Sequence, residues 1–200
     1  MGYGQDTSFD TQVKFRSIKS IFAKHLNNYF LRAVGYINID TCISGDILSP
    51  SATPSLKSVF MNTLEGIPSN KSGVSYASFL KDYYSKAEEG EKRLRDRIGN
   101  VGAGSDQAAF AFYAGIPSTD HVFVLNKLKY PNMDSSSYPA YHTGFETFYM
   151  VDKLMDPGFK LSKVCTAAAL QNVIQLAESP VLPYSLENIV RRDQVNKKNK

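Results

Sequence analysis

The chain has 200 residues, a mass of 22.2 kDa and a hydrophobic fraction of 42%, which is enough for one domain with its own core. Charged residues make up 21%, so the composition excludes a disordered, collagen-like or coiled-coil protein. The net charge of +4 resides in the last ten residues, which hold five basic groups and one acid. The other 190 residues sum to zero, so the basic balance indicates a solvated tail and gives no evidence for a nucleic-acid surface.

Cysteine usage and hydropathy exclude further classes. No apolar run reaches the roughly 18 residues that a membrane span requires, and we expect no signal peptide because the N-terminus lacks a basic stretch followed by an apolar block. The two cysteines, Cys42 and Cys165, are too few for a disulfide framework. They form no C-x-x-C pair of the kind that binds structural zinc. We therefore expect both to be small core residues.

The first predicted element is an amphipathic helix over residues 9–33. Its apolar positions recur at three- and four-residue steps: Phe15, Ile18, Phe22, Leu26 and Tyr29. Lysines lie between them, so a helix at a membrane surface is an alternative. We favour a helix that packs against the core.

The middle of the chain alternates strand and helix patterns. Residues 34–40 predict a buried strand that ends on an acid. A helix then starts near residue 55 and continues through Leu64, where Gly66 and Pro68 end it. Residues 66–75 form a polar loop and residues 76–86 a helix. The charged stretch 87–97 is compatible with a helix or a solvated loop.

The second half of the chain continues the alternation. We predict a short helix over 106–113 with Ser105 or Asp106 as its cap, and a strand over 121–126. A loop rich in Pro, Ser and Tyr covers 129–141, and helices follow over 144–154 and 159–178. Apolar strands separated by helical segments predict an α/β fold with a sheet buried on both faces.

Two residues could carry chemistry. Asp40 follows a buried strand, at the place where α/β enzymes bind ligands, and an unpaired carboxylate there would need a metal, a cation or several donors. A helix cap or turn residue is the alternative. His142 lies between a polar loop and a helix, where a neutral imidazole could bind zinc or transfer protons. A hydrogen-bonded structural histidine is its alternative.

Several segments, taken in order, resemble one family. They are Tyr36–Asp40, Gly102–Asp106, Phe110–Pro117, Tyr138–Phe148 and Asp156–Phe159. This order resembles the M28 zinc peptidases, in particular the branch of glutamate carboxypeptidase II and the N-acetylated-alpha-linked acidic dipeptidases, of which transferrin receptor is a non-catalytic relative. The resemblance covers residues 34–184, so the organisation is an unmatched helix over 1–33, the C-terminal half of the catalytic domain over 34–184, and a basic tail over 185–200.

The resemblance implies a fold and a set of roles. The family domain is a three-layer sandwich with a mixed sheet flanked by helices, and its site holds two zinc ions. By motif, Asp40 is a ligand of one zinc and His142 a ligand of the other. Tyr141 corresponds to the tyrosine whose hydroxyl stabilises the oxyanion. Gly104 and Ser105 fall where the family lines its substrate cleft.

The sequence also departs from the family pattern. The general-base glutamate and three of five zinc ligands should precede the 34–40 strand, but the first glutamate is Glu65. A catalytic zinc needs about three protein ligands, so we expect the chain alone to be inactive. The family's substrate-binding arginines are absent, and Asp120 stands in their place. An anion there favours a free amino terminus over an acidic side chain, with a surface aspartate of no substrate role as the alternative.

Two functional hypotheses follow. The first is a fragment or truncated form of a zinc exopeptidase that acts near a peptide terminus, either like an aminopeptidase or like an acidic dipeptidase. The second is a non-catalytic binding protein derived from the same fold, in the manner of transferrin receptor. The resemblance implies a peptide substrate for the full-length form. The charge balance leads us to expect no nucleic-acid partner. Family members are membrane-anchored homodimers that face outside the cell, but the family's dimerisation domain is not matched in this chain.

Overall fold

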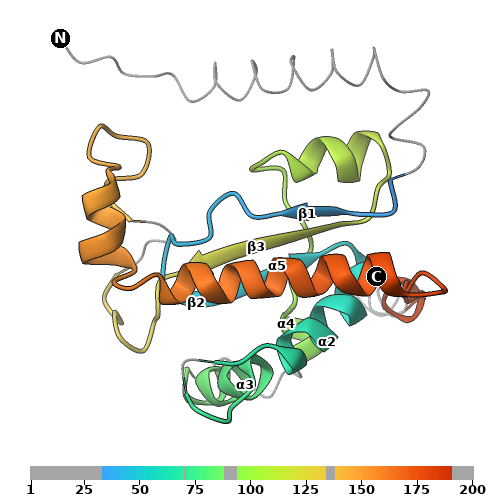
Figure 1. Ribbon diagram of the computed structural model, residues 1–200, viewed down its shortest axis with the longest axis horizontal. Helices are drawn as coiled ribbons and strands as arrows, with labels where there is room; N and C mark the ends of the chain where they lie inside the picture. Colours follow the sequence, from blue (N-terminus) through green and yellow to red (C-terminus); the bar gives the residue numbers. More distant parts are fainter. Residues whose placement is uncertain (1–32, 70, 88–93, 134–137, 191–200) are drawn as a thin grey trace, which may run out of the picture.

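The computed structural model describes residues 33–69, 71–87, 94–133 and 138–190. The predicted helix over 1–33 lies outside these ranges except for its last residue, as do residues 191–200 of the predicted tail. Within the described part, three strands form one mixed sheet in the order β1-β3-β2 (Figure 1). No helix of the described part is long and apolar enough to cross a membrane.

The central strand is β3, Ser118–Val124. Strand β1, Tyr36–Asn38, pairs with it in parallel, and strand β2, Ile47–Ala52, pairs with it antiparallel. The strands predicted over 34–40 and 121–126 are therefore confirmed, with shifted ends. A mixed sheet packed against helices agrees with the predicted α/β class.

Strand β2 was not predicted, because Pro50 and its serine neighbours resemble a loop. The structure shows why a proline is tolerated there. The Pro50 carbonyl accepts a hydrogen bond from Gly99 N at 2.8 Å, on the side of β2 away from β3. The main-chain nitrogen of Pro50 points to that same side, so its missing N–H removes no hydrogen bond from the ladder with β3.

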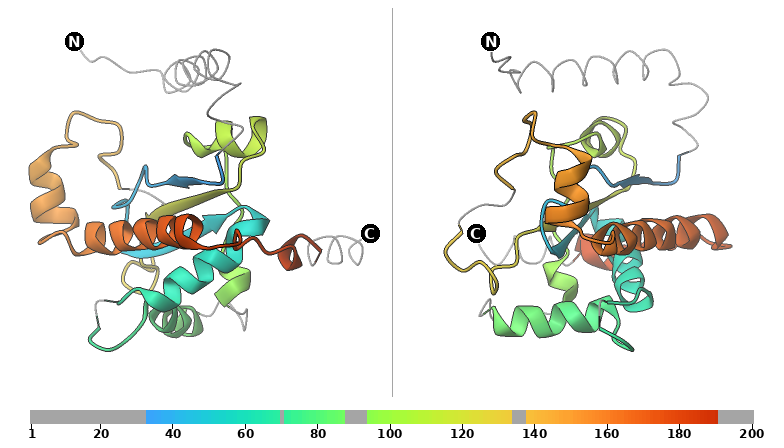
Figure 2. Two further views of the ribbon diagram at one scale, coloured as in Figure 1. Left: turned by 45° about the vertical axis from the view of Figure 1, so that its right-hand side comes forward. Right: turned by 60° about the vertical axis from the view of Figure 1, so that its left-hand side comes forward.

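Helices cover one face of the sheet. The short turn η2 (Pro54–Leu56) leads into α2 (Lys57–Gly66), which is followed by α3 (Tyr76–Lys86) and α4 (Leu94–Arg97). The long helix α5, Lys160–Glu178, lies along the sheet and contacts β1, β3 and α2 (Figures 1 and 2). The helices predicted near 55–64, over 76–86 and over 159–178 are confirmed.

The two faces of the sheet are buried to different extents. Along β3, Thr119, His121 and Phe123 are fully buried beneath the helices, whereas Asp120 and Val122 on the other face are only half-buried. The π-helical segment η3, Ala109–Tyr113, covers part of that second face, where Phe110 stacks on Tyr36 at 3.9 Å. We expected both faces of the sheet to be buried. In the described sheet one face is fully buried and the other is only partly covered.

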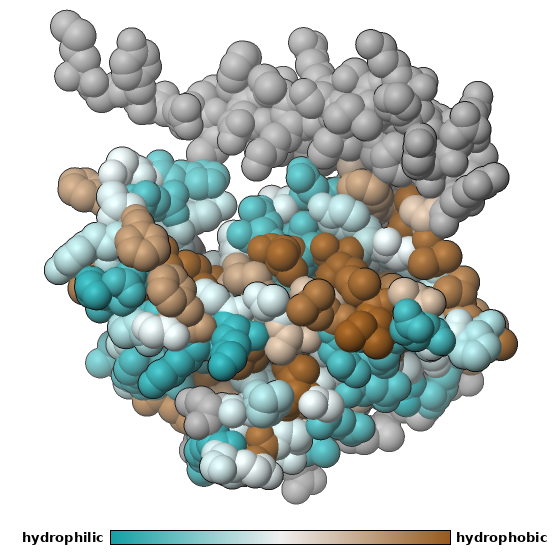
Figure 3. Space-filling view, in the orientation of Figure 1, coloured by the Kyte–Doolittle hydropathy of each residue, from teal (hydrophilic) through white to brown (hydrophobic). Residues whose placement is uncertain are grey.

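Two further segments complete the described chain. The π-helical segment η4, Met150–Met155, corresponds to the predicted helix over 144–154 but is shorter. Residues 185–190, predicted to begin the tail, contact the helical layer: Glu187 pairs with Arg95 at 2.8 Å, and Ser185 N donates to Ser55 O. A patch of hydrophobic side chains remains on the outer surface over α5 (Figure 3).

Candidate active site

Asp40 lies in the turn that follows β1, at the carboxyl end of that strand. It is exposed, and its Oδ2 accepts a hydrogen bond from Ser105 Oγ at 2.7 Å. The structure thus brings together Asp40 and Ser105, which are 65 residues apart in sequence. Gly104 is exposed beside Ser105, and a Cβ at Gly104 would meet no atom within 4 Å. The loop therefore lies open next to the Asp40 carboxylate.

Asp120 occupies the middle of β3 on the half-buried face of the sheet. Its register partners are Asn38 in β1 and Ser51 in β2. The Asn38 amide donates to Asp120 Oδ1 at 2.8 Å, and the Gln107 amide donates to Oδ2 at 3.4 Å. Burial raises the pKa of Asp120 and the nearby Asp40 charge adds to this, although the Asn38 hydrogen bond opposes it. This carboxylate is fixed in position and points away from the helical layer.

The Tyr36 hydroxyl lies near three carboxylates, and they affect its ionisation. Its pKa is raised by burial first, and then by the negative charges of Asp106, Asp40 and Asp120. We call these three aspartates the acidic cluster. Three carboxylates therefore lie close enough to the Tyr36 hydroxyl to disfavour its ionised form.

Gln107 lies beside Asp120, and its side-chain oxygen has no hydrogen-bond donor. The residue is 2% exposed, its Nε2 faces Gly102 O and Asp120, and its Oε1 has no hydrogen-bond partner. A buried carbonyl oxygen without a donor is costly and indicates a place for an N–H group. Sequence reasoning missed both Gln107 and Asn38. The position of Asn38, two residues before Asp40 in a strand, was an available signal, whereas no local pattern indicates Gln107.

Tyr141 and His142 lie on the exposed loop that precedes η4. The His142 ring stacks on Tyr141 at 3.9 Å, and its main-chain N–H donates to Glu146 Oε2 at 3.1 Å. The Tyr138 hydroxyl donates to the other oxygen of Glu146. His142 has a left-handed backbone, with φ of 59°, which is uncommon for a residue with a side chain.

The segment 138–155 lies beyond the carboxyl ends of β1 and β3 (Figures 1 and 2). It therefore lies at the same end of the sheet as Asp40. Within the described residues, the contacts of His142 and Tyr141 are with each other and with their own loop, and none of them joins Asp40. The structure thus places these predicted residues at one end of the sheet without bringing them into contact.

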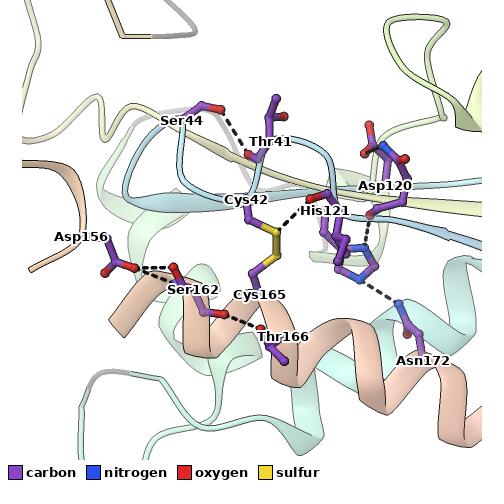
Figure 4. The surroundings of a disulfide bond; sticks show 12 residues. Thr41, Cys42, Ser44, Asp120, His121, Asp156, Ser162, Cys165, Thr166 and Asn172 are labelled. Atoms are coloured by element: carbon purple, nitrogen blue, oxygen red, sulfur yellow. Dashed lines mark hydrogen bonds between the residues drawn. A yellow bond between two sulfur atoms is a disulfide. The ribbon is translucent and has the colours of Figure 1, made fainter. Parts of the chain in front are cut away.

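A disulfide bond anchors the turn that carries Asp40. Cys42 in this turn is bonded to Cys165 in α5, with their Cα atoms 5.9 Å apart (Figure 4). Cys165 is buried in the core as expected and Cys42 packs against it, but the bond between them was not predicted. The fold brings the turn after β1 across α5, and a separation of 123 residues gives no local signal of this pairing.

The start of α5 is held by the Asp-Pro-Gly-Phe motif. Asp156 is buried and accepts hydrogen bonds from Leu161 N at 2.8 Å, Ser162 N at 2.9 Å and Ser162 Oγ at 2.7 Å (Figure 4). Burial alone would raise the pKa of Asp156, but these hydrogen bonds outweigh it and lower the pKa. The positive φ of Gly158, 76°, turns the chain into the helix. The motif thus has a structural role at the helix start.

The described residues do not form a complete zinc site on their own. No group of three or more His, Cys, Asp or Glu side chains within the described ranges could hold a metal ion. A catalytic zinc takes about three protein ligands plus water. Asp40 and His142 have the right donor chemistry, but each could give only one ligand. The two residues by themselves cannot fix the geometry of a catalytic zinc ion.

The amino-acid sequence of the chain is similar to those of several known proteins. No family model matches the chain. Mouse aminopeptidase NAALADL1 is 32% identical over 160 residues, which cover 78% of this chain and 21% of that protein. The probable glutamate carboxypeptidase LAMP1 of Arabidopsis thaliana is 29% identical over 157 residues, or 77% of this chain and 20% of that protein. A glutamate carboxypeptidase 2 homolog of Caenorhabditis briggsae is 33% identical over 128 residues, 62% of this chain and 16% of that protein. The chain thus spans about a fifth of the length of such relatives.

Proposed function

The chain belongs, as a partial domain, to the family of the glutamate carboxypeptidases and NAALADL1, and from that relationship we propose that it is part of a zinc exopeptidase that hydrolyses peptide bonds near a terminus. The observation that carries the proposal is Asp40, an exposed carboxylate at the carboxyl end of β1 held by Ser105. In this proposal the three-stranded sheet is one section of the larger mixed sheet of a zinc-exopeptidase sandwich.

We assign one role to each residue of the site. Asp40 gives one oxygen ligand to one zinc, and His142 gives one nitrogen ligand to the other. The Tyr141 hydroxyl donates to the oxygen that gains negative charge as the amide carbon becomes tetrahedral. The left-handed backbone of His142 supports a functional loop, because a strained residue of this kind costs about 1–3 kcal/mol and is retained at sites that use it.

The bound metal would supply an activated water and polarise the amide carbonyl. The remaining ligands and the general base must come from residues outside those described. One carboxylate or one imidazole cannot fix the geometry of a zinc ion, so we propose that this chain by itself has no peptidase activity.

The test uses a chimera in which residues 34–184 replace the matching segment of mouse aminopeptidase NAALADL1. We expect the chimera to bind zinc and to hydrolyse aminoacyl substrates. Asp40→Ala and His142→Ala should each remove activity and lower the zinc content, whereas Tyr141→Phe should lower kcat and leave the zinc content unchanged. Asp82→Ala, which removes an exposed carboxylate on α3, is the matched control.

A second candidate function is a non-catalytic binding protein derived from this fold, as transferrin receptor is. This function needs no complete metal site, and the described residues do not form one by themselves. In that case the chimera would fold, form the Cys42–Cys165 bond and melt cooperatively, but it would neither retain zinc nor hydrolyse substrate. The same chimera therefore separates the two functions.

We further propose that Asp120 selects substrates with a free amino terminus. The support is its fixed, half-buried carboxylate and the neighbouring charges of Asp40 and Asp106. In the chimera, Asp120→Asn should lower kcat/KM for free-amino peptides at least about ten-fold, or about 1.4 kcal/mol. N-acetylated peptides should be unaffected or improved. An equal loss on both substrates would contradict this role.

A further inference from the structure

Helix α5 carries an exposed apolar stripe. Leu170, Val173 and Ile174 are 55%, 45% and 51% exposed, and Ala177 is exposed beside them. Their spacing of three, four and seven residues places them on one side of the helix. The core-facing residues of α5, such as Cys165 and Asn172, lie on another side. We call these four residues the α5 stripe. Figure 3 shows hydrophobic side chains gathered on the outer surface over α5.

The α5 stripe lies on the β1 side of the helix. On the opposite flank α5 packs against α2, where Gln175 donates to Thr63 at 2.7 Å. Strand β1 is an edge strand of the described sheet. Val34, before β1, and Ile39, just after it, are exposed apolar residues as well. Contiguous exposed apolar surface of this kind marks a site where another segment packs.

The chain itself supplies a segment at this place. Residues 9–33 carry the apolar series from Phe15 to Tyr29 and lead directly into β1. The start of β1 lies against the C-terminal half of α5: a Cβ on Gly35 would contact the Leu176 side chain, and the Tyr184 hydroxyl donates to Val34 O. The segment thus enters the described fold beside the α5 stripe.

The length of this segment fits the α5 stripe, and its net charge is opposite in sign to that of the described fold. Residues 1–32 hold two acids and five bases, a net +3, whereas residues 33–190 hold sixteen acids and thirteen bases, a net −3. A helix from Phe15 to Tyr29 is about 21 Å long, and the α5 stripe from Leu170 to Ala177 is about 10 Å long. Residues 30–33 are enough to make the turn between that helix and β1.

We propose that residues 9–33 form an amphipathic helix that packs its apolar side on the α5 stripe of the same chain. Because it precedes β1 and returns along it, this helix runs beside α5 and covers the surface next to the free edge of β1. The predicted basic side then faces solvent. The proposal does not depend on peptidase activity.

The experiment uses the full chain, which contains no tryptophan. Leu170→Trp places a single fluorophore in the stripe. We expect emission at short wavelength and quenching by acrylamide several-fold weaker than for free tryptophan amide. Adding Phe22→Asp should restore the emission and quenching of an exposed indole. Adding Ser20→Asp, the same charge on the opposite side of the predicted helix, should not.

A second measurement needs no disruptive substitution. A photoreactive benzoyl-phenylalanine at position 22 should crosslink to residues 160–178 within one chain, as located by mass spectrometry. Three results would overturn the proposal. They are an exposed indole in Leu170→Trp alone, crosslinks or indole protection that appear only as chain concentration rises, and protection that appears only when anionic phospholipid vesicles are added. The second would assign the stripe to another copy of the chain, and the third to a lipid surface.

Discussion

The Nε2 atom of His121 lies 3.0 Å from the Asn172 side-chain nitrogen, and this buried pair joins β3 to α5 (Figure 4). The other ring nitrogen, Nδ1, lies 2.9 Å from Asn38 O. Because a carbonyl only accepts, Nδ1 carries the proton, and Nε2 accepts from Asn172. Asn172 Oδ1 is itself occupied by the Thr63 hydroxyl at 2.5 Å. The hydrogen bonds around His121 therefore require its neutral form, with one ring nitrogen protonated.

This arrangement predicts a loss of stability in acid. Burial lowers the pKa of His121 from 6.5 to about 4. A depressed pKa means that the unfolded chain binds the proton first, so the stability is present above pH 6.5 and is lost as pH falls toward 4. The loss is about 3 kcal/mol over that range. Urea unfolding at pH 7 and pH 4.5 measures it.

The control for this prediction is His121→Gln, which keeps a polar side chain and cannot titrate. The variant is expected to be less stable at pH 7 but to lose less stability on acidification than the native chain. All other titratable groups are the same in both proteins, so the comparison isolates His121. An equal pH dependence in both proteins would show that His121 is not the responsible group.

The Cys42–Cys165 bond predicts a redox-dependent stability. Closing a loop of this length contributes roughly 3–5 kcal/mol by restricting the unfolded chain. The double variant Cys42→Ser, Cys165→Ser should melt at a correspondingly lower temperature. In the native chain, intact mass after alkylation without reductant should show no modified thiol. Two alkyl groups added under those conditions would contradict the bond.

Gly45 is predicted to accept no side chain. A Cβ at this position would clash with the main chain of Val124, which cannot move without disturbing β3. Gly45→Ala should therefore lower the free energy of unfolding by about 2 kcal/mol or more. Gly104→Ala, where a Cβ meets nothing within 4 Å, is the matched control and should change stability little. Similar melting curves for the two variants would refute the close approach.

Asp156 should stabilise the start of α5. Its carboxylate satisfies the N–H groups of Leu161 and Ser162, so Asp156→Ala should cost about 1–2 kcal/mol. Asp156→Asn keeps one acceptor oxygen and should cost less. Because the pKa of Asp156 is lowered in the fold, its contribution is present above the ordinary value of 3.8 and is lost as pH falls below it. Chemical unfolding of the three proteins at pH 7 and pH 3 checks both points.

Elements with a strong local pattern were predictable from sequence. The helices near 76–86 and 159–178 have apolar residues at helical spacing, and β3 contains a run of β-branched and aromatic residues. Strand β2 was missed because tolerance of Pro50 depends on which edge its main chain faces. That edge is defined only after Gly99 has packed beside it.

The sequence by itself determined the family resemblance, the α/β class and the position of Asp40 at a strand end, because each depends on residues close together in the chain. Only the tertiary structure decided which distant residues meet. It joined Cys42 to Cys165 and placed Gln107 beside Asp120 with an unused acceptor. It also left the α5 stripe exposed, since the burial of a helix side depends on its neighbours. Local periodicity encodes the elements, whereas long-range packing determines the contacts between them.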